Sequence, residues 1–113
     1  MTELYFSLVD IKHLLSFILK NKTAEQAVML RIAKKEGAVS LSLADEPSPN
    51  CPTVREMGEP LEEDEGWEED FPIDRRFFSL IQEADNWGHL VLALNDEEMN
   101  VYLEENGMKG CLN

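Results

Sequence analysis

Apolar and polar residues follow a strand–helix–hairpin pattern in the second half of the chain. Residues 71–110 open on a short apolar stretch, and Asp74 marks the start of a helix. The helical period gives this helix an apolar face of Phe77, Phe78, Leu80 and Ile81. The polar stop at residues 85–88 ends the helix, and alternation over residues 89–94 and 100–104 then predicts a hairpin.

The same order of elements recurs, more loosely, in the first half of the chain. Residues 4–8 alternate as a strand does, and Asp10 is placed to cap the helix that follows. The apolar positions of that helix, spaced at the helical period, are Ile11, Leu14, Leu15, Ile18 and Leu19. Residues 27–33 and 39–43 alternate on either side of a Lys-Lys-Glu-Gly turn. This half therefore predicts a strand, a helix and a hairpin in the same order.

An acidic, proline-rich segment joins the two halves. Residues 46–70 contain four of the five prolines, and residues 45–70 hold eleven Asp or Glu residues against one Arg, within a chain of net charge −13. Proline removes backbone donors and like charges repel, so we predict a loop here, with residues 53–57 open as a short edge strand. The prediction is a single α+β domain: a first unit at residues 4–45, this loop, and a second unit at residues 71–113, with both helices packed on antiparallel sheet.

The two halves also carry a family likeness. The second half reads FPIDRRFFSLIQEADNWGHLVLALNDEEMNVYLEENG, with an apolar residue, a proline, a short basic stretch, a double apolar step and two alternating strands. In the first half, FSLVDIKHLLSFIL is followed by VMLRIAKKEGAVSLSLADE. Together they resemble one domain of a bacterial DNA sliding clamp, the DNA polymerase III β subunit. The resemblance implies two strand–helix–strands units related by a pseudo-two-fold axis, with helices lining a ring and strands forming its outer wall.

The resemblance implies a non-catalytic binding module associated with DNA replication or with interference in it. Basic residues of the two helices would then face nucleic acid and contact phosphates without reading sequence. These residues are Lys12, Lys20, Lys22, Arg75 and Arg76. A solvated helix face explains the same residues, because their number is ordinary for two helices. The chain departs from the family in having one domain where a bacterial clamp has three, and no segment matches the family's peptide-binding pocket.

The acidic segment supports an alternative function of a different class. An inhibitor, an immunity-type protein or a DNA mimic would use residues 45–70 to block a basic surface on a protein partner. The residues expected to bind that partner are Glu62, Glu63, Asp64, Glu65, Trp67, Glu68, Glu69 and Asp70. A loop that only solvates the chain has the same composition. Of the two tryptophans, Trp67 is the better partner-binding candidate, and Trp87 is predicted to cover one end of the core.

The sequence contains no recognisable catalytic motif. Ser16 and Ser79 lack an activating His–Asp arrangement, and His13 and His89 lack the spacing of a metal site. We therefore expect no enzyme, no cofactor and no metal, but a protein partner, with DNA contact through the helices and self-association left open. The longest apolar run, residues 8–19, is too short and polar to span a bilayer, and the start lacks a signal-peptide pattern. A cytoplasmic protein is the expectation.

Overall fold

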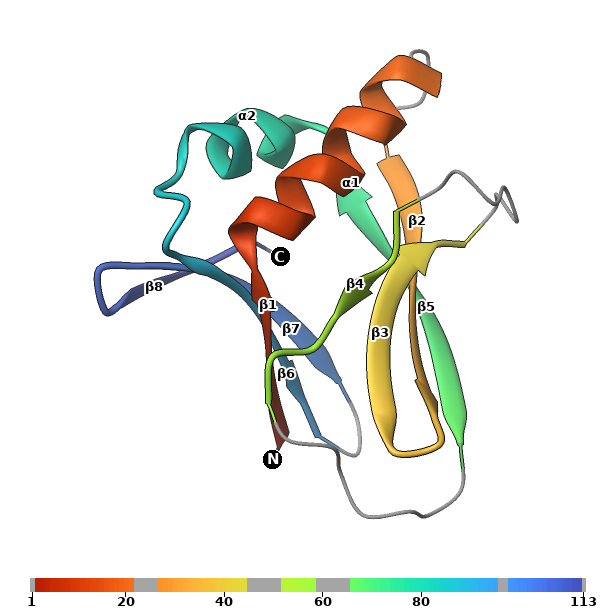
Figure 1. Cartoon of the computed structure of the whole chain (residues 1–113). Helices are drawn as coiled ribbons and strands as arrows, with labels where there is room; N and C mark the ends of the chain where they lie inside the picture. The colour runs from red at the N-terminus through yellow and green to blue at the C-terminus, as the bar shows by residue number, and fades with distance from the viewer. Residues whose placement is uncertain (1, 22–26, 45–51, 59–65, 96–97, 113) are drawn as a thin grey trace.

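Two helices and two antiparallel sheets make up the fold (Figure 1). This computed structural model describes residues 2–21, 27–44, 52–58, 66–95 and 98–112. The elements are β1 (Thr2–Ser7), α1 (Leu8–Asn21), β2 (Ala27–Lys35), β3 (Ala38–Leu43), β4 (Val54–Arg55), β5 (Trp67–Asp74), α2 (Arg76–Glu83), β6 (His89–Leu94), β7 (Met99–Glu105) and β8 (Met108–Cys111). One sheet has the strand order β1-β6-β7-β8 and the other the order β4-β3-β2-β5. The predicted α+β class is therefore confirmed.

The first strand of each half pairs with the hairpin of the other half. β1 runs antiparallel to β6, with Tyr5 opposite Val91, although about three-quarters of the chain lies between them. β5 runs antiparallel to β2 in the same way, with Phe71 opposite Leu30. Neither half can therefore complete its sheet alone, and the two halves must fold together.

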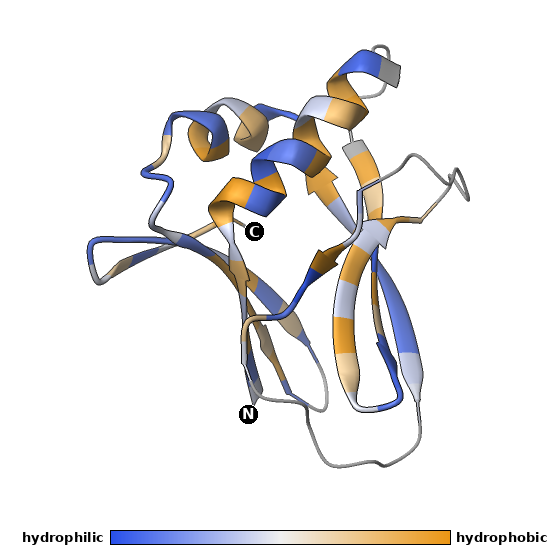
Figure 2. Cartoon of the chain, viewed as in Figure 1, coloured by the Kyte–Doolittle hydropathy of each residue, from blue (hydrophilic) through white to orange (hydrophobic). Residues whose placement is uncertain are grey.

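A single hydrophobic core unites both sheets and both helices. Its largest fully buried side chains are Leu4, Phe6, Leu8, Ile11, Leu14, Leu15, Ile18, Leu30, Ile32, Leu41, Ile81 and Leu90. In Figure 1 the two helices lie side by side on the same side of the sheets, and α1 runs across from β1 towards β2. Apolar and polar residues alternate along several strands in Figure 2, and strands such as β1 and β3 turn one face to this core.

Helix α1 follows the sequence pattern closely except at its start. It begins at Leu8, so Asp10 lies within its first turn and does not cap it. A carboxylate there still interacts favourably with the helix dipole. Leu8, which the sequence predicts as the end of a strand, is fully buried and belongs to the helix.

Helix α2 is shorter than predicted and buries fewer residues. It begins at Arg76, whose backbone N–H donates a hydrogen bond to the side chain of Asp74, two residues earlier. Phe78 and Ile81 are buried, but Leu80 is 52 % exposed, so its predicted place on the buried face is wrong. With only eight residues, the helix presents a narrow stripe to the core, and Leu80 lies beside that stripe.

The two predicted hairpins are confirmed, because β2 pairs with β3 and β6 pairs with β7. Glu36 and Gly37 close the β2–β3 hairpin with φ of 53° and 82°, and Asn106 and Gly107 close the β7–β8 hairpin with φ of 52° and 80°. Positive φ at both central residues is the signature of a type I′ turn, whose twist matches that of paired strands.

The predicted loop at residues 46–70 contains two strands. β4 forms at Val54–Arg55, within the stretch that the sequence left open as an edge strand. β5 begins at Trp67, so the last four residues of the predicted loop are strand instead. Pairing with β2 overrides the local charge repulsion, because Arg31 stands opposite Asp70. Residues 45–51 and 59–65 lie outside the described part of the chain. Among the described helices, none is long and apolar enough to cross a membrane.

Candidate binding cleft

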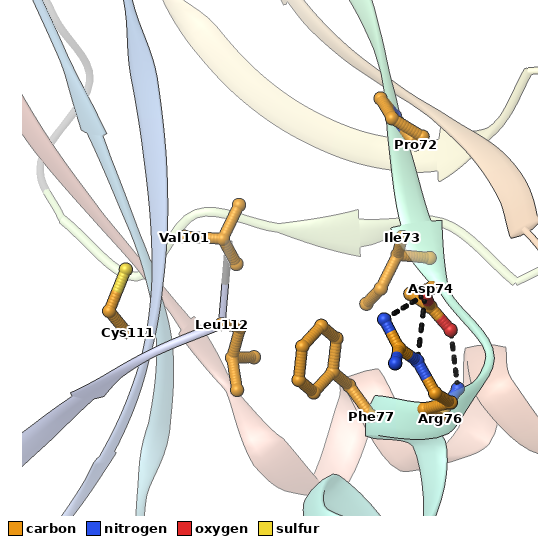
Figure 3. Close-up of a pocket in the computed structure, with 8 residues that line it drawn as sticks. All are labelled: Pro72, Ile73, Asp74, Arg76, Phe77, Val101, Cys111 and Leu112. Atoms are coloured by element: carbon orange, nitrogen blue, oxygen red, sulfur yellow. Dashed lines mark hydrogen bonds and ion pairs between the residues drawn. The ribbon is translucent and has the colours of Figure 1, made fainter.

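An apolar cleft opens between the start of α2 and the last two strands. Its volume is about 500 Å³, and it is lined by Pro72, Ile73, Asp74, Arg76, Phe77, Val101, Cys111 and Leu112. Ile73, Val101 and Leu112 form a buried floor, each less than a tenth exposed, and Phe77 forms a half-buried wall. In Figure 3 these four side chains point towards one another across the cleft. The size falls in the range of about 300–1,000 Å³ that ligand pockets occupy.

Strand pairing and local turns bring these residues together. The β5 strand carries Ile73 to the base of α2, which starts three residues later, at Arg76, and positions Phe77 in its first turn. On the other side, the Leu112 N–H donates to the Val101 carbonyl oxygen at 2.8 Å, which holds the end of β8 against β7. The cleft thus lies between an edge strand of one sheet and an edge strand of the other.

An ion pair forms the polar part of the cleft. The Arg76 side chain donates from Nε to Asp74 Oδ2 at 3.0 Å and lies 2.9 Å from the same oxygen through Nη2. The Arg76 backbone N–H donates to Asp74 Oδ1 at 2.9 Å. The side-chain hydrogen bond, followed by the backbone one, lowers the pKa of Asp74, and the same contact raises the pKa of Arg76. Asp74 is therefore a bound carboxylate at neutral pH and is not poised for proton transfer.

This ion pair predicts a measurable shift in titration. We expect NMR titration of the Asp74 carboxyl to give a midpoint below its ordinary value, and Arg76→Ala to reverse most of the shift. The variant keeps its backbone N–H, so part of the lowering remains. Because the folded pKa is the lower one, the pair stabilises the fold above the unfolded pKa, and this contribution is lost as pH falls through the folded pKa. Gln82→Ala, on the same helix, serves as control; an unchanged Asp74 midpoint in Arg76→Ala would contradict the assignment.

A second hollow lies next to the cleft, beneath the β7–β8 hairpin. Its volume is about 480 Å³, and its apolar lining includes Leu80, Leu103 and Met108. Leu80 and Met108 are mostly exposed, at 52 % and 77 %, and the buried Leu112 in this lining is shared with the cleft. The exposed Leu80 is the natural control position for tests of the cleft.

The basic residues predicted to face nucleic acid have different roles in the structure. Lys12 is half-buried, and its Nζ donates to the Ala84 carbonyl oxygen and to Asn86 Oδ1 at 2.5 and 2.6 Å. Arg76 is bound to Asp74, as described above. Lys20 is exposed in the last turn of α1, and Arg75 is half-buried just before α2. Lys22 lies outside the described residues.

The acidic residues predicted to bind a partner are only partly described. Glu68, Glu69 and Asp70 are exposed on β5, an edge strand, while residues 62–65 lie outside the described part of the chain. Asp70 accepts two hydrogen bonds from Arg31, from Nε at 2.7 Å and from Nη2 at 3.1 Å. Hydrogen bonding to the Arg31 side chain lowers the pKa of Asp70. The acidity that β5 presents to solvent is therefore partly neutralised.

The two tryptophans lie in different environments, and only the prediction for Trp87 is contradicted. Trp67 is half-buried and packs against the core, whereas Trp87 is 88 % exposed. The prediction that Trp87 covers the core is wrong, because the residue lies in the tight turn between α2 and β6 and its side chain is exposed to solvent. Trp67 begins β5 and continues the inward face of that strand, which also carries Phe71.

The sequence did not identify the cleft as a site. Alternation indicates that Val101 faces inward, but no short motif connects it with residues 72–77 or with Leu112. In the described segments, no group of His, Cys, Asp and Glu side chains could hold a metal ion. The chain matches no protein-family model, no curated protein sequence and no solved structure.

Proposed function

We propose that this chain is a non-catalytic, clamp-like binding module whose cleft receives apolar side chains of a peptide from a protein partner. The observation that carries the proposal is the buried apolar floor of the cleft, Ile73, Val101 and Leu112, beside the half-exposed ring of Phe77. Burying a partner's leucine or phenylalanine there would contribute about 1.5–3 kcal/mol per side chain.

The chemistry of the lining favours binding over catalysis. Among the described residues of the lining, the carboxylate is Asp74, which is held by Arg76, and apolar side chains supply most of the remaining surface. A small polar substrate would need several converging polar groups to fix its orientation. An extended peptide needs fewer, because it can insert apolar side chains while its backbone stays in water. A peptide partner therefore fits this lining better than a metabolite does.

The topology supports the clamp-like part of the proposal. Both halves have the order strand, helix and three strands, and each gives its first strand to the other's sheet. This correspondence is what a duplicated unit with a pseudo-two-fold axis would produce, as the sliding-clamp resemblance implies. On that resemblance we assign the module to DNA replication or to interference with it.

Direct contact with DNA has weaker support than peptide binding. Lys12 and Arg76 are engaged within the chain, which leaves Lys20 as an exposed cation on α1. With a net charge of −13, the chain as a whole repels phosphates. The module is therefore proposed to act first on protein partners, with any DNA contact secondary and strongly dependent on salt.

Peptide titration tests the proposed function. The probes are fluorescent synthetic peptides in which serine alternates with leucine, isoleucine or phenylalanine, and an alanine–serine peptide is the blank. We expect saturable binding of at least one apolar probe and none of the blank. Phe77→Ala should weaken binding by about tenfold or more, as loss of an interface anchor does, while Leu80→Ala should leave it nearly unchanged.

Two results would contradict the cleft as the site. One is the absence of binding by every apolar probe; the other is a larger effect of Leu80→Ala than of Phe77→Ala, which would assign binding to the second hollow.

The exposed acids of β5 support a second candidate, a protein that blocks a basic surface. Deleting residues 62–70 would remove half of β5, so the double variant Glu68→Gln/Glu69→Gln is the cleaner test. Binding of an arginine-rich peptide that fails in this variant but survives Phe77→Ala would favour the blocking function. Unchanged binding of the apolar probes in the double variant favours the cleft.

A further inference from the structure

Trp87 is the most exposed of the large apolar side chains in the described part of the chain, at 88 %. It lies in the turn of residues 84–88 between α2 and β6, here termed the Trp87 turn. In Figure 1 this turn lies at one flank of the molecule, near the start of α1. It shares no residue with the cleft, so any role is separate from the function proposed above.

Neighbouring elements brace the Trp87 turn from outside. From α1, Lys12 Nζ donates to the Ala84 carbonyl oxygen at 2.5 Å and to Asn86 Oδ1 at 2.6 Å. From β7, Glu105 Oε2 accepts the Asp85 N–H at 3.0 Å. A turn fixed in this way loses little conformational entropy when a partner binds it.

Further hydrogen bonds close the turn around Trp87 itself. Asp85 Oδ1 accepts the Trp87 N–H at 3.0 Å, and the Asp85 carbonyl oxygen accepts the Gly88 N–H at 2.9 Å. The Leu8 N–H, at the start of α1, donates to the Gly88 carbonyl oxygen at 3.2 Å. Each of these bonds uses backbone or neighbouring side chains, so an indole is not required to form the turn. The fold positions the ring without depending on it.

The charges at the turn indicate the kind of partner. Glu83, Asp85 and Glu105 contribute three carboxylates, and Lys12 contributes one ammonium group. The whole chain carries a charge of −13, of which residues 45–70 supply −10, so the acidity of the turn itself comes from its own three carboxylates. Nucleic acid and a second copy of this acidic chain would both be repelled, whereas a basic surface would be attracted.

We propose that the Trp87 turn is a second protein-binding surface, on which Trp87 anchors a basic partner by inserting into an apolar pocket rimmed by Arg or Lys. Tryptophan is among the residues most enriched at the energetic centres of interfaces. Its ring also interacts favourably with cations that lie over its face. The acidic rim of the turn complements the basic rim of the pocket.

Photo-crosslinking from position 87 tests the surface. The probe is a benzophenone amino acid, placed at position 87 in cells that produce the chain and at Leu80 as the matched control. We expect one basic protein to be crosslinked from position 87 and not from position 80. The purified partner is then titrated against the full chain by calorimetry, because the key variant removes the Trp87 ring and a readout from its emission would be lost. Trp87→Ala should weaken binding about thirtyfold, the loss typical of an interface hot spot, and raised salt should weaken binding further.

Each alternative result overturns the proposal. Equal crosslinking from positions 80 and 87, crosslinking only to a second copy of the chain, or an acidic partner would each contradict it. So would an unchanged affinity in Trp87→Ala. The thermal midpoint of Trp87→Ala should match that of the parent chain, so lost binding cannot be attributed to misfolding. Phe77→Ala should leave this interaction intact, which separates it from the cleft.

Discussion

Replacing Gly88 by alanine will lower the free energy of unfolding by about 3 kcal/mol, at the upper end of the cost of overpacking. An added Cβ would collide with the Glu104 carbonyl oxygen and lie 2.9 Å from Leu8 Cδ1. The first neighbour is backbone of β7, which cannot move without disturbing its pairing with β6. The second is a fully buried core side chain, so relief in that direction is costly too.

Gly110→Ala is the matched control for this change. A Cβ at Gly110 meets no atom within 4 Å, so the same substitution should change stability by no more than about 0.5 kcal/mol. Urea unfolding followed by circular dichroism measures both variants. Equal stability of the two would mean that Gly88 is not packed as tightly as the structure indicates.

Truncating Phe6 to alanine will cost about 4 kcal/mol, within the usual range for a buried phenylalanine. Phe6 is fully buried on β1 and stands opposite Leu90 of β6, so it packs a strand of the first half into the sheet of the second. A domain of this size is stable by roughly 5–15 kcal/mol, so the loss removes much of the total.

Trp87→Ala is the control for this change, because it removes an exposed aromatic ring where Phe6→Ala removes a buried one. Because that ring is 88 % exposed, its removal should change stability by about 0.5 kcal/mol or less. The same unfolding experiment compares the two variants. If Phe6→Ala lowered the free energy of unfolding by less than about 1 kcal/mol, the packing of β1 against β6 would be contradicted.

Local pattern was sufficient to predict most of the elements. The helical spacing of apolar residues from Ile11 to Ile18 predicts α1. The Glu-Gly turn at residues 36–37 predicts the first hairpin. Each signal lies inside the segment that it specifies. Helix α1 begins three residues earlier than predicted, at Leu8 instead of Ile11, because the apolar Leu8 suits the end of a strand and the start of a helix equally well. Such signals are readable because the interacting residues are close in sequence.

Strand exchange could not be predicted from these local signals. Nothing in residues 2–7 specifies that β1 pairs with β6 and not with its own hairpin, since the partner lies more than eighty residues away. The same long-range pairing converts the acid run at residues 67–70 from an expected loop into strand, through the contact of Asp70 with Arg31. Local charge repulsion is a weaker term than a full row of backbone hydrogen bonds.

The cleft depends on the same long-range pairing. Ile73 and Phe77 come from one end of the second unit and Leu112 from the other, and each alone reads as an ordinary core residue. The site exists because the end of β8 packs near the start of α2 and leaves a hollow between them. Composition showed that the chain is acidic, but the position of an apolar cleft required the three-dimensional arrangement.

The most direct test of the central claim is methyl-selective NMR during titration with an apolar probe peptide. If the cleft is the binding site, saturable shifts should concentrate on the methyl groups of Ile73 and Val101, which line the cleft and not the second hollow, while those of Val9, on the exposed side of α1, stay in place. Shifts centred instead on Leu80 and Leu103, or none at saturating peptide, would contradict the proposed function.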